Sequence, residues 1–261
     1  MVMKNNTYRW MVLLWVLIHS TLSFAYVEVN GIYYNLNTSA KTASVTYRTT
    51  DYGSYSGKIV IPTSISSNGT TYNVTSIGSS AFKACSGLTS VSIPNSVTSI
   101  GYNAFYDCSG LKSLTIGNSV TSIGEFAFGG CSNLPSVTIP NSVTSIDERA
   151  FEGCSSLTSV TIPQSVTNIG KFAFSLCSRL TAVYISDLTA WCKITFGNIL
   201  SNPLYFANQL YLNGNEVKNL IIPNSVTDIG AYAFNGCSAL TSVTIPNSVA
   251  NIGSSAFEGC I

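Results

Sequence analysis

Cysteine returns every 23 residues along most of this 261-residue chain. The surrounding sequence repeats with it in the pattern L-x-x-V-x-I-P-x-S-V-T-x-I-G-x-x-A-F-x-x-C, and residues 157–177 are one complete copy. One such unit cannot bury its apolar face alone, so successive copies must stack on one another. The chain is therefore predicted to form a repeat solenoid. The cysteines that mark the period are Cys85, Cys108, Cys131, Cys154, Cys177, Cys237 and Cys260.

Each copy begins with a segment typical of a β-strand. In residues 88–93, apolar and polar side chains alternate, which directs Val91 and Ile93 inward and Ser90 and Ser92 outward. Strands of neighbouring copies are expected about 4.8 Å apart, so that equivalent side chains form columns. Short irregular or helical segments would complete the convex side. The other inward positions of this copy are expected at Val97, Ile100, Ala104, Phe105 and Cys108.

Two longer spacings interrupt the period. Ile61 and Ile93 lie 32 positions apart, and the extra segment contains Asn68-Gly69, which is typical of a type I′ hairpin turn. Ile185 and Ile222 lie 37 positions apart. The second insertion, residues 187–216, is predicted to be a variant repeat.

The second insertion begins with a helix signal and ends with a hairpin signal. Asp187 is expected to cap a short helix that runs through Trp191 and Cys192. Residues 210–217 are expected to form a hairpin around Asn213-Gly214. Residues 26–57 are interpreted as an N-terminal β cap with a turn at Asn30-Gly31, and residues 58–261 as the solenoid itself.

Residues 1–25 have the pattern of a signal peptide. Lys4 and Arg9 precede nine apolar residues, and Ser23-Phe24-Ala25 places small residues before a cleavage site at Tyr26. A membrane span needs about 20 apolar residues, so an uncleaved anchor is the weaker interpretation. The mature chain is expected to be secreted or held at the cell surface, with no transmembrane span.

The repeat resembles the BspA-like leucine-rich-repeat surface proteins. The I-P-x-S-V-T-x-I-G-x-x-A-F-x-x-C unit carries the resemblance, and so does the insertion with Trp191-Cys192 and residues 202–205 and 210–214. The resemblance implies a leucine-rich-repeat right-handed superhelix, or horseshoe, of about eight strand-bearing turns. It also implies adhesion to or recognition of an extracellular or host protein, a glycoprotein or a glycan. A structural spacer without a ligand of its own is the alternative.

The residue inventory argues against an enzyme. The single histidine, His19, lies in the predicted signal peptide, so the mature chain has none for a Ser-His or Cys-His site or for a zinc ligand. Glu125, Glu148 and Glu152 are interpreted as solvated charges on the convex side. No cofactor or metal motif is found. Only 9% of residues are charged and the net charge is +1, which gives nucleic acid no basic surface to bind.

The cysteines occupy positions where other leucine-rich repeats have apolar residues. They are therefore expected to be buried free thiols. Neighbouring cysteines would be about 5 Å apart with parallel Cβ directions, at the edge of disulfide geometry, so scattered disulfides stay open as an alternative.

Two surfaces are candidates for ligand binding. Outward strand positions form rows that include Ser136 with Thr138, Ser159 with Thr161, and Ala182 with Tyr184; the next rows are expected to be Asn219 with Ile221 and Ser242 with Thr244. On the convex side, Phe126, Arg149 and Phe172 share one column, so Arg149 is expected between two rings. The interpretations without function are β-propensity for the rows and an internal cation–π stack for the column. Thr rows on a regular solenoid can also suggest ice binding, but Ser interrupts them.

Overall fold

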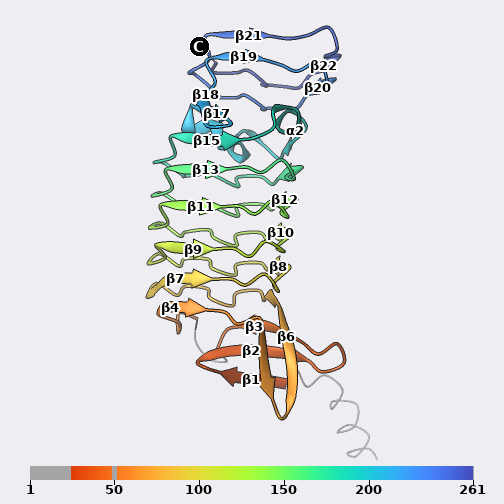
Figure 1. Cartoon of the computed structure of the whole chain (residues 1–261). Helices are drawn as coiled ribbons and strands as arrows, with labels where there is room; N and C mark the ends of the chain where they lie inside the picture. The colour runs from red at the N-terminus through yellow and green to blue at the C-terminus, as the bar shows by residue number, and fades with distance from the viewer. Residues whose placement is uncertain (1–24, 49–51, 261) are drawn as a thin grey trace, which may run out of the picture.

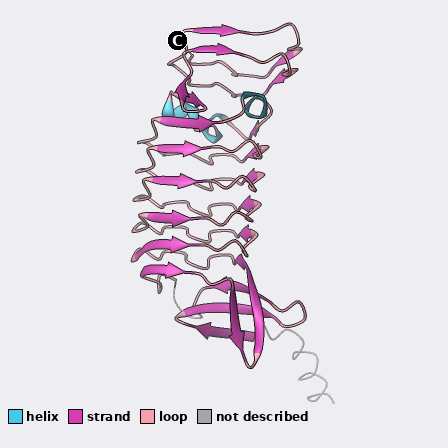
Figure 2. Cartoon of the chain, viewed as in Figure 1, coloured by secondary structure: helices cyan, strands magenta, loops and turns pink. Residues whose placement is uncertain are grey.

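The computed structural model describes residues 25–48 and 52–260, and the predicted signal peptide lies outside these residues except for Ala25. Its turns stack in one gently curved column of about eight, which confirms the predicted repeat solenoid (Figure 1). Almost all regular structure is strand (Figure 2). Among the described residues, no helix is long and apolar enough to cross a bilayer.

A small sheet lies at the N-terminal end of the column (Figure 1). Strands β1 (Ala25–Val29), β2 (Ile32–Asn37) and β3 (Thr42–Thr46) form an antiparallel meander. The hairpin of β5 (Ser64–Ser67) and β6 (Thr70–Ile77) joins it, because β6 runs parallel to β3. Both predicted turns are confirmed: Asn30, Gly31, Asn68 and Gly69 all have positive φ, as type I′ requires. The end of β6 then pairs with the first two-residue strand of the solenoid.

The strand face of the solenoid carries the predicted strands in parallel register. A first group contains β4 (Gly57–Val60), β7 (Leu88–Ser92) and β9 (Ser113–Thr115), and a second contains β11 (Ser136–Thr138), β13 (Ser159–Thr161) and β15 (Ala182–Ile185). Strand pairing is interrupted between β9 and β11. Lys112 and Thr158 donate their N–H groups to the preceding turn, whereas Pro135 at the equivalent position has no N–H to donate.

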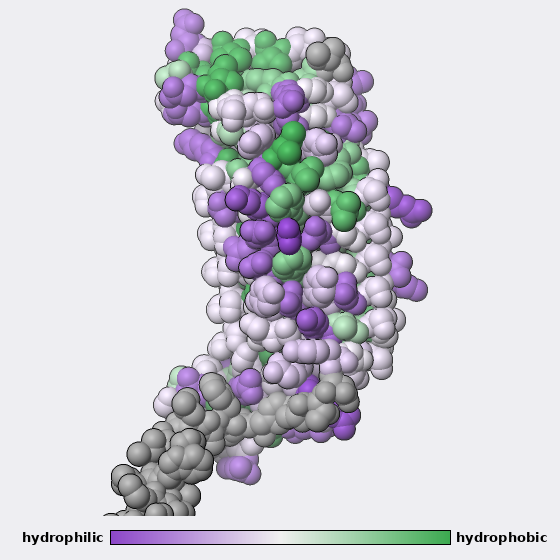
Figure 3. Space-filling view, turned by 180° about the vertical axis from the view of Figure 1, so that it is seen from behind, coloured by the Kyte–Doolittle hydropathy of each residue, from purple (hydrophilic) through white to green (hydrophobic). Residues whose placement is uncertain are grey.

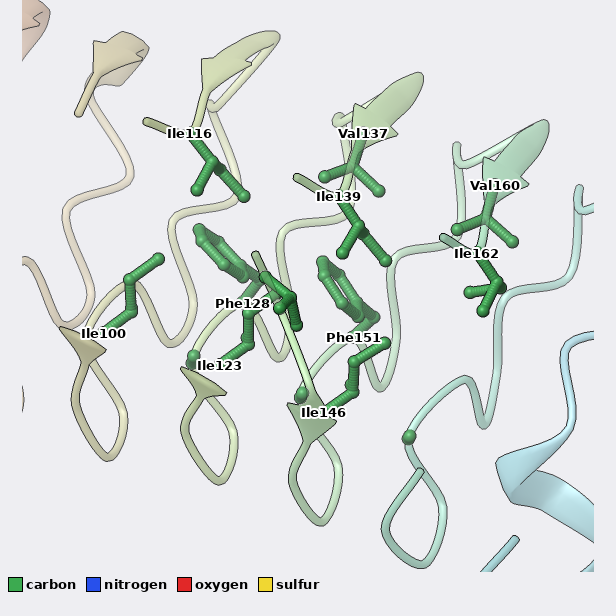
Figure 4. Packing of buried hydrophobic residues seen from close by; sticks show 14 of the residues in the cluster. Ile100, Ile116, Ile123, Phe128, Val137, Ile139, Ile146, Phe151, Val160 and Ile162 are labelled. Carbon is green, nitrogen blue, oxygen red and sulfur yellow. The ribbon is translucent and has the colours of Figure 1, made fainter. Parts of the chain in front are cut away.

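A second parallel sheet runs along another side of the column, and the sequence did not predict it as strand. It consists of two-residue strands that continue from β6: β8 (Ser99–Ile100), β10 (Ser122–Ile123), β12 (Ser145–Ile146), β14 (Asn168–Ile169) and β16 (Thr195–Phe196). The isoleucines of these strands point into the core as expected, and Figure 4 shows Ile100, Ile123 and Ile146 in one column.

The core between these sides consists of columns of identical residues. Phe105, Phe128 and Phe151 are fully buried, and their rings stack with centroids 5.1 and 5.4 Å apart. Figure 4 shows Phe128 and Phe151 side by side beneath the inward valines and isoleucines of the strand face. All seven inward positions predicted for residues 88–108 are buried. Every turn thus completes the core of its neighbours.

The insertion after β15 adds a turn of its own. It contains α2 (Leu188–Cys192), β16, the 3-10 helix η2 (Ile199–Ser201), α3 (Leu204–Ala207), β17 (Leu210–Leu212) and β18 (Asn215–Glu216). The predicted helix cap is confirmed, because Asp187 accepts a hydrogen bond from the Ala190 N–H at 2.9 Å. The predicted hairpin is also confirmed by the antiparallel pairing of β17 with β18.

Side chains join the insertion to the last turns. Beyond it lie β19 (Asn219–Ile221), β20 (Asp228–Ile229), β21 (Ser242–Thr244) and β22 (Asn251–Ile252), which pair only among themselves in the described chain. Trp191 Nε1 donates to the Ala233 carbonyl at 2.8 Å, and Asn202 Nδ2 donates to the carbonyls of Tyr232 and Ala233. In the regular turns, a backbone N–H of the preceding turn donates to the equivalent carbonyl instead, as the Phe82 N–H does to the Ala104 carbonyl.

Candidate functional site

The third side of each turn, from the glycine column to the cysteine, is called the turn face here. Its backbone has two residues with positive φ, four positions apart, in every regular turn. In the middle turns the first of these residues are Phe126, Arg149 and Phe172, with φ of 53°, 56° and 60°. Left-handed backbone is costly for residues other than glycine. It persists here because it keeps the N–H groups of Phe126 and Arg149 bonded to carbonyls of the next turn, at 3.0 and 2.9 Å.

The predicted aromatic–arginine column is confirmed. The Arg149 guanidinium carbon lies 5.2 Å from the centroid of the Phe126 ring and 5.1 Å from that of Phe172. All three residues are half-buried, and the Arg149 side chain keeps 38% of its surface exposed. A cation held between two rings at this exposure contributes about 0.5–1 kcal/mol per ring. The guanidinium is therefore fixed in place and still reachable by a partner.

Two glutamates extend this column with negative charge. Glu148 and Glu152 place carboxylate oxygens 3.7 and 3.8 Å from Arg149 Nε. They were expected to be merely solvated, and the structure shows that they form ion pairs. Asp147 stands in the glycine column beside them, and burial raises the pKa of its carboxyl group while a hydrogen bond from Ser145 lowers it.

Further aromatic side chains continue the column toward the N-terminal end. Tyr106 packs edge-on against Phe126 with centroids 5.6 Å apart, and Tyr102 lies 6.5 Å from the same ring. Gly129 leaves the space for this, since a Cβ there would come within 3.2 Å of both the Phe126 and Tyr106 rings. Lys83 Nζ lies 5.1 Å from the Tyr52 ring and 5.9 Å from that of Tyr106.

We give the name turn-face patch to Arg149, the aromatic residues of its column and Leu176. Leu176 has a φ of 62° and is 63% exposed, an unfavourable combination for a leucine. The patch is defined as Tyr102, Tyr106, Phe126, Arg149, Phe172 and Leu176. Of these, the sequence had identified only Phe126, Arg149 and Phe172.

A comparison among the turns of the chain itself could have found the others. Counted from the glycine column, the third, fourth and seventh residues are Ala, Phe and Cys in all seven copies. The first, second, fifth and sixth residues differ between copies, and all of them lie on the turn face. Figure 3 views the molecule from behind and shows hydrophilic and hydrophobic side chains mixed along the middle of the column, between paler margins.

The strand face, in contrast, is nearly uniform. The predicted rows are confirmed by the strand register, which pairs Ser136 with Ser159, Thr138 with Thr161, and Thr161 with Tyr184. The next row was predicted wrongly. Tyr211 of β17 pairs with Tyr184, in the place where Ile221 was expected, because the insertion supplies a strand of its own.

The cysteine column is buried, as predicted, except for the partly exposed Cys260, and its thiols are free. Five of its seven thiols donate to the carbonyl of the phenylalanine 26 residues earlier, as Cys131 does to Phe105 and Cys154 to Phe128, both at 3.3 Å. Burial raises the pKa of both thiols well above the usual range, so they stay protonated and unreactive. Within the described residues no cluster of histidine, cysteine or carboxylate side chains could hold a metal ion.

Stacked turns with an inward L-x-x-V-x-I strand define a leucine-rich-repeat protein. The profile of the BspA type leucine-rich repeat region matches residues 75–203 and 205–261 in six copies. The chain belongs to this family.

Solved structures agree with this assignment. The leucine-rich repeat protein TpLRR of T. pallidum is 26% identical over 90% of this chain and 88% of its own, with a TM-score of 0.56. A leucine-rich repeat protein from Bacteroides ovatus is 26% identical over 90% of this chain and 80% of its own, with a TM-score of 0.51. Comparison with curated proteins gives no match.

Proposed function

We propose that this chain is a secreted or cell-surface recognition protein that binds an extracellular protein or glycoprotein through the turn-face patch. One observation carries the proposal: in the regular turns from β7 to β13 the strand face repeats Ser and Thr, while four positions of the turn face vary from one turn to the next. A surface that only supports the fold has no need to vary from turn to turn.

The chemistry of the patch supports the same proposal. Aromatic residues and arginine are the types enriched at binding hot spots, and Arg149 is held rigidly between two rings. A rigid side chain loses little conformational entropy when a partner binds. The predicted signal peptide supports export, and the lack of histidine in residues 26–261 supports recognition without catalysis.

The experiment compares mature wild-type protein with the triple variant Phe126→Ser, Arg149→Ser, Phe172→Ser on a panel of immobilised extracellular-matrix and plasma glycoproteins. Tyr232→Ser is the matched control, because Tyr232 occupies the same column with a φ of 64° but lies beyond the insertion. The triple variant should lose binding while its Tm falls by only about 2–4 °C for each kcal/mol of lost ring–cation contact. The control should bind like the wild type.

The structural-spacer alternative makes the opposite prediction. A spacer would bind no member of the panel, and the triple variant would behave like the wild type in every assay. Retained binding by the triple variant would instead exclude the turn-face patch.

A further inference from the structure

One site on the strand face departs from the Ser and Thr pattern. Tyr184 of β15 and Tyr211 of β17 lie side by side in register, with ring centroids 4.8 Å apart and ring planes inclined by 28°. Both side chains are half-buried, and the Tyr211 hydroxyl lies 3.3 Å from Gln209 Oε1. The insertion therefore places an aromatic pair next to the Ser and Thr rows of β7 to β13.

A cleft opens directly beside this pair. In the described chain β18 pairs only with β17, and β19 only with β21, so the hairpin and the next turn separate. A cavity of about 560 Å³ lies between them, with Leu212, Val217 and Leu220 among its lining residues. Ile221 also lines the cavity and is 68% exposed. Glu216, which also lines the cavity, is the cross-strand partner of Tyr211, so the aromatic pair lies at the edge of the cleft, next to its lining residues.

The polar groups of the cleft are amides. Asn213, Asn215 and Asn219 line it and are exposed, and the positive φ values of Asn213 and Gly214 fix the turn that carries the first two. The two charged lining residues offset each other, because Lys218 Nζ lies 3.5 Å from a Glu216 carboxylate oxygen. Asn219 Oδ1 already accepts from the hydroxyls of Thr241 and Ser242, at 3.0 and 2.8 Å, and Asn215 Nδ2 donates to the Asn213 carbonyl at 3.4 Å. The remaining amide groups offer both donors and acceptors with no net charge.

We propose that this cleft binds a neutral glycan. The apolar C–H face of a sugar ring packs against the tyrosine rings, and its hydroxyls exchange hydrogen bonds with amides that both donate and accept. An extended peptide fits less well, since β18 and β19 offer strand edges of only two and three residues. The balanced charge gives no preference for acidic or basic ligands. This inference deepens the proposed recognition function with a second site, separate from the turn-face patch.

The test uses the mature chain, labelled with a fluorophore at its N-terminus, on an array that holds neutral oligosaccharides, sulfated and sialylated oligosaccharides, and extended peptides. Hits are then titrated by isothermal calorimetry. We expect retention of neutral oligosaccharides, with an affinity that hardly changes between low and high salt. Tyr211→Ala should weaken binding about tenfold or more, as should the double variant Asn215→Ala, Asn219→Ala.

Three controls separate recognition from folding. Tyr211→Phe keeps the ring and should retain most of the affinity, while Thr115→Ala, at an exposed position of β9 away from β15, should bind as the wild type does. The triple variant of the turn-face patch should also keep glycan binding, so that the two proposals fail independently. Retention of only charged glycans, retention of only peptides, or no retention at all would each overturn the inference.

Discussion

Asn202 gives the sharpest test of how the insertion is joined to the last turns. Its side chain is fully buried and makes three hydrogen bonds. Nδ2 donates to the Tyr232 carbonyl at 2.6 Å and to the Ala233 carbonyl at 3.1 Å, and Oδ1 accepts from the Leu204 N–H at 2.9 Å. We predict that Asn202→Ala lowers the free energy of unfolding by about 1–3 kcal/mol.

The magnitude follows from the groups that lose a partner. The Ala233 carbonyl keeps the Trp191 Nε1 donor at 2.8 Å, so it is not left alone. The Tyr232 carbonyl likewise keeps the Asn235 N–H at 2.9 Å, so the Leu204 N–H is the group that loses its hydrogen-bond partner, and a buried unpaired group costs about 1–3 kcal/mol. Asn202→Asp should be worse at neutral pH, because a carboxylate would face the two carbonyls.

That second variant has a distinct pH signature. Burial beside carbonyls raises the pKa of the new carboxyl group above its value in the unfolded chain, so the folded state binds the proton more tightly. The stability of Asn202→Asp should therefore be greatest at low pH and fall as pH rises above about 4.

Urea unfolding followed by Trp191 fluorescence measures both effects. Trp191 is the only tryptophan in residues 26–261 and lies at the same junction. Asn224→Ala, at an exposed turn position, is the control and should stay within about 0.5 kcal/mol of wild type. If Asn202→Ala stays within the same range, the side chain does not join the two parts of the column, and the reasoning fails.

Three further predictions concern other features. Leu176→Gly should raise the free energy of unfolding by about 0.5–1 kcal/mol, because relief of a left-handed backbone cost of about 1–2 kcal/mol exceeds the added unfolded-state entropy. Gly153→Leu, at the equivalent position of the preceding turn, should lower the free energy of unfolding, and a change of the same sign for both variants in urea titrations would disprove the strain. The buried thiols of the cysteine column should resist iodoacetamide in the folded chain and react completely in denaturant without reductant, as measured by intact mass; a blocked thiol in denaturant would mean a disulfide. Export from the native host should give a chain that begins at Tyr26, and recovery of Met1 on the soluble product would exclude cleavage.

The sequence predicted the parts of the fold that rest on residue type at fixed spacing. The inward columns followed from the period of 23 residues, and the turns at Asn30-Gly31, Asn68-Gly69 and Asn213-Gly214 followed from residues that tolerate positive φ. The helix cap at Asp187 followed from its carboxylate. Each of these depends on neighbours close in sequence.

The features that the sequence missed depend on contacts between turns. Two-residue strands such as β8 are too short to show alternation in the sequence. The sequence therefore predicted only two inward side chains in this part of each repeat, and no second sheet. Phe126 has left-handed backbone without the usual glycine, because its N–H bond to the Glu148 carbonyl of the adjoining turn holds it, and Leu176 has the same backbone conformation. The strand β17 was predicted as part of a hairpin, but its place beside β15 was missed because the repeat period assigns that row to Ile221.

The strict register between turns also bears on how such a gene can change. Ser122 pairs with Ser145, and Ser145 with Asn168, in each case one repeat later, so each turn meets the next through the same set of positions. Duplication or loss of 23 codons within the regular copies therefore adds or removes one whole turn and leaves every column intact. The molecule would lengthen by about 4.8 Å for each copy gained, and the varied turn face would grow by four new positions. Unequal recombination can thus change the turn face by whole turns, and each resulting gene still encodes a chain whose turns stack in register.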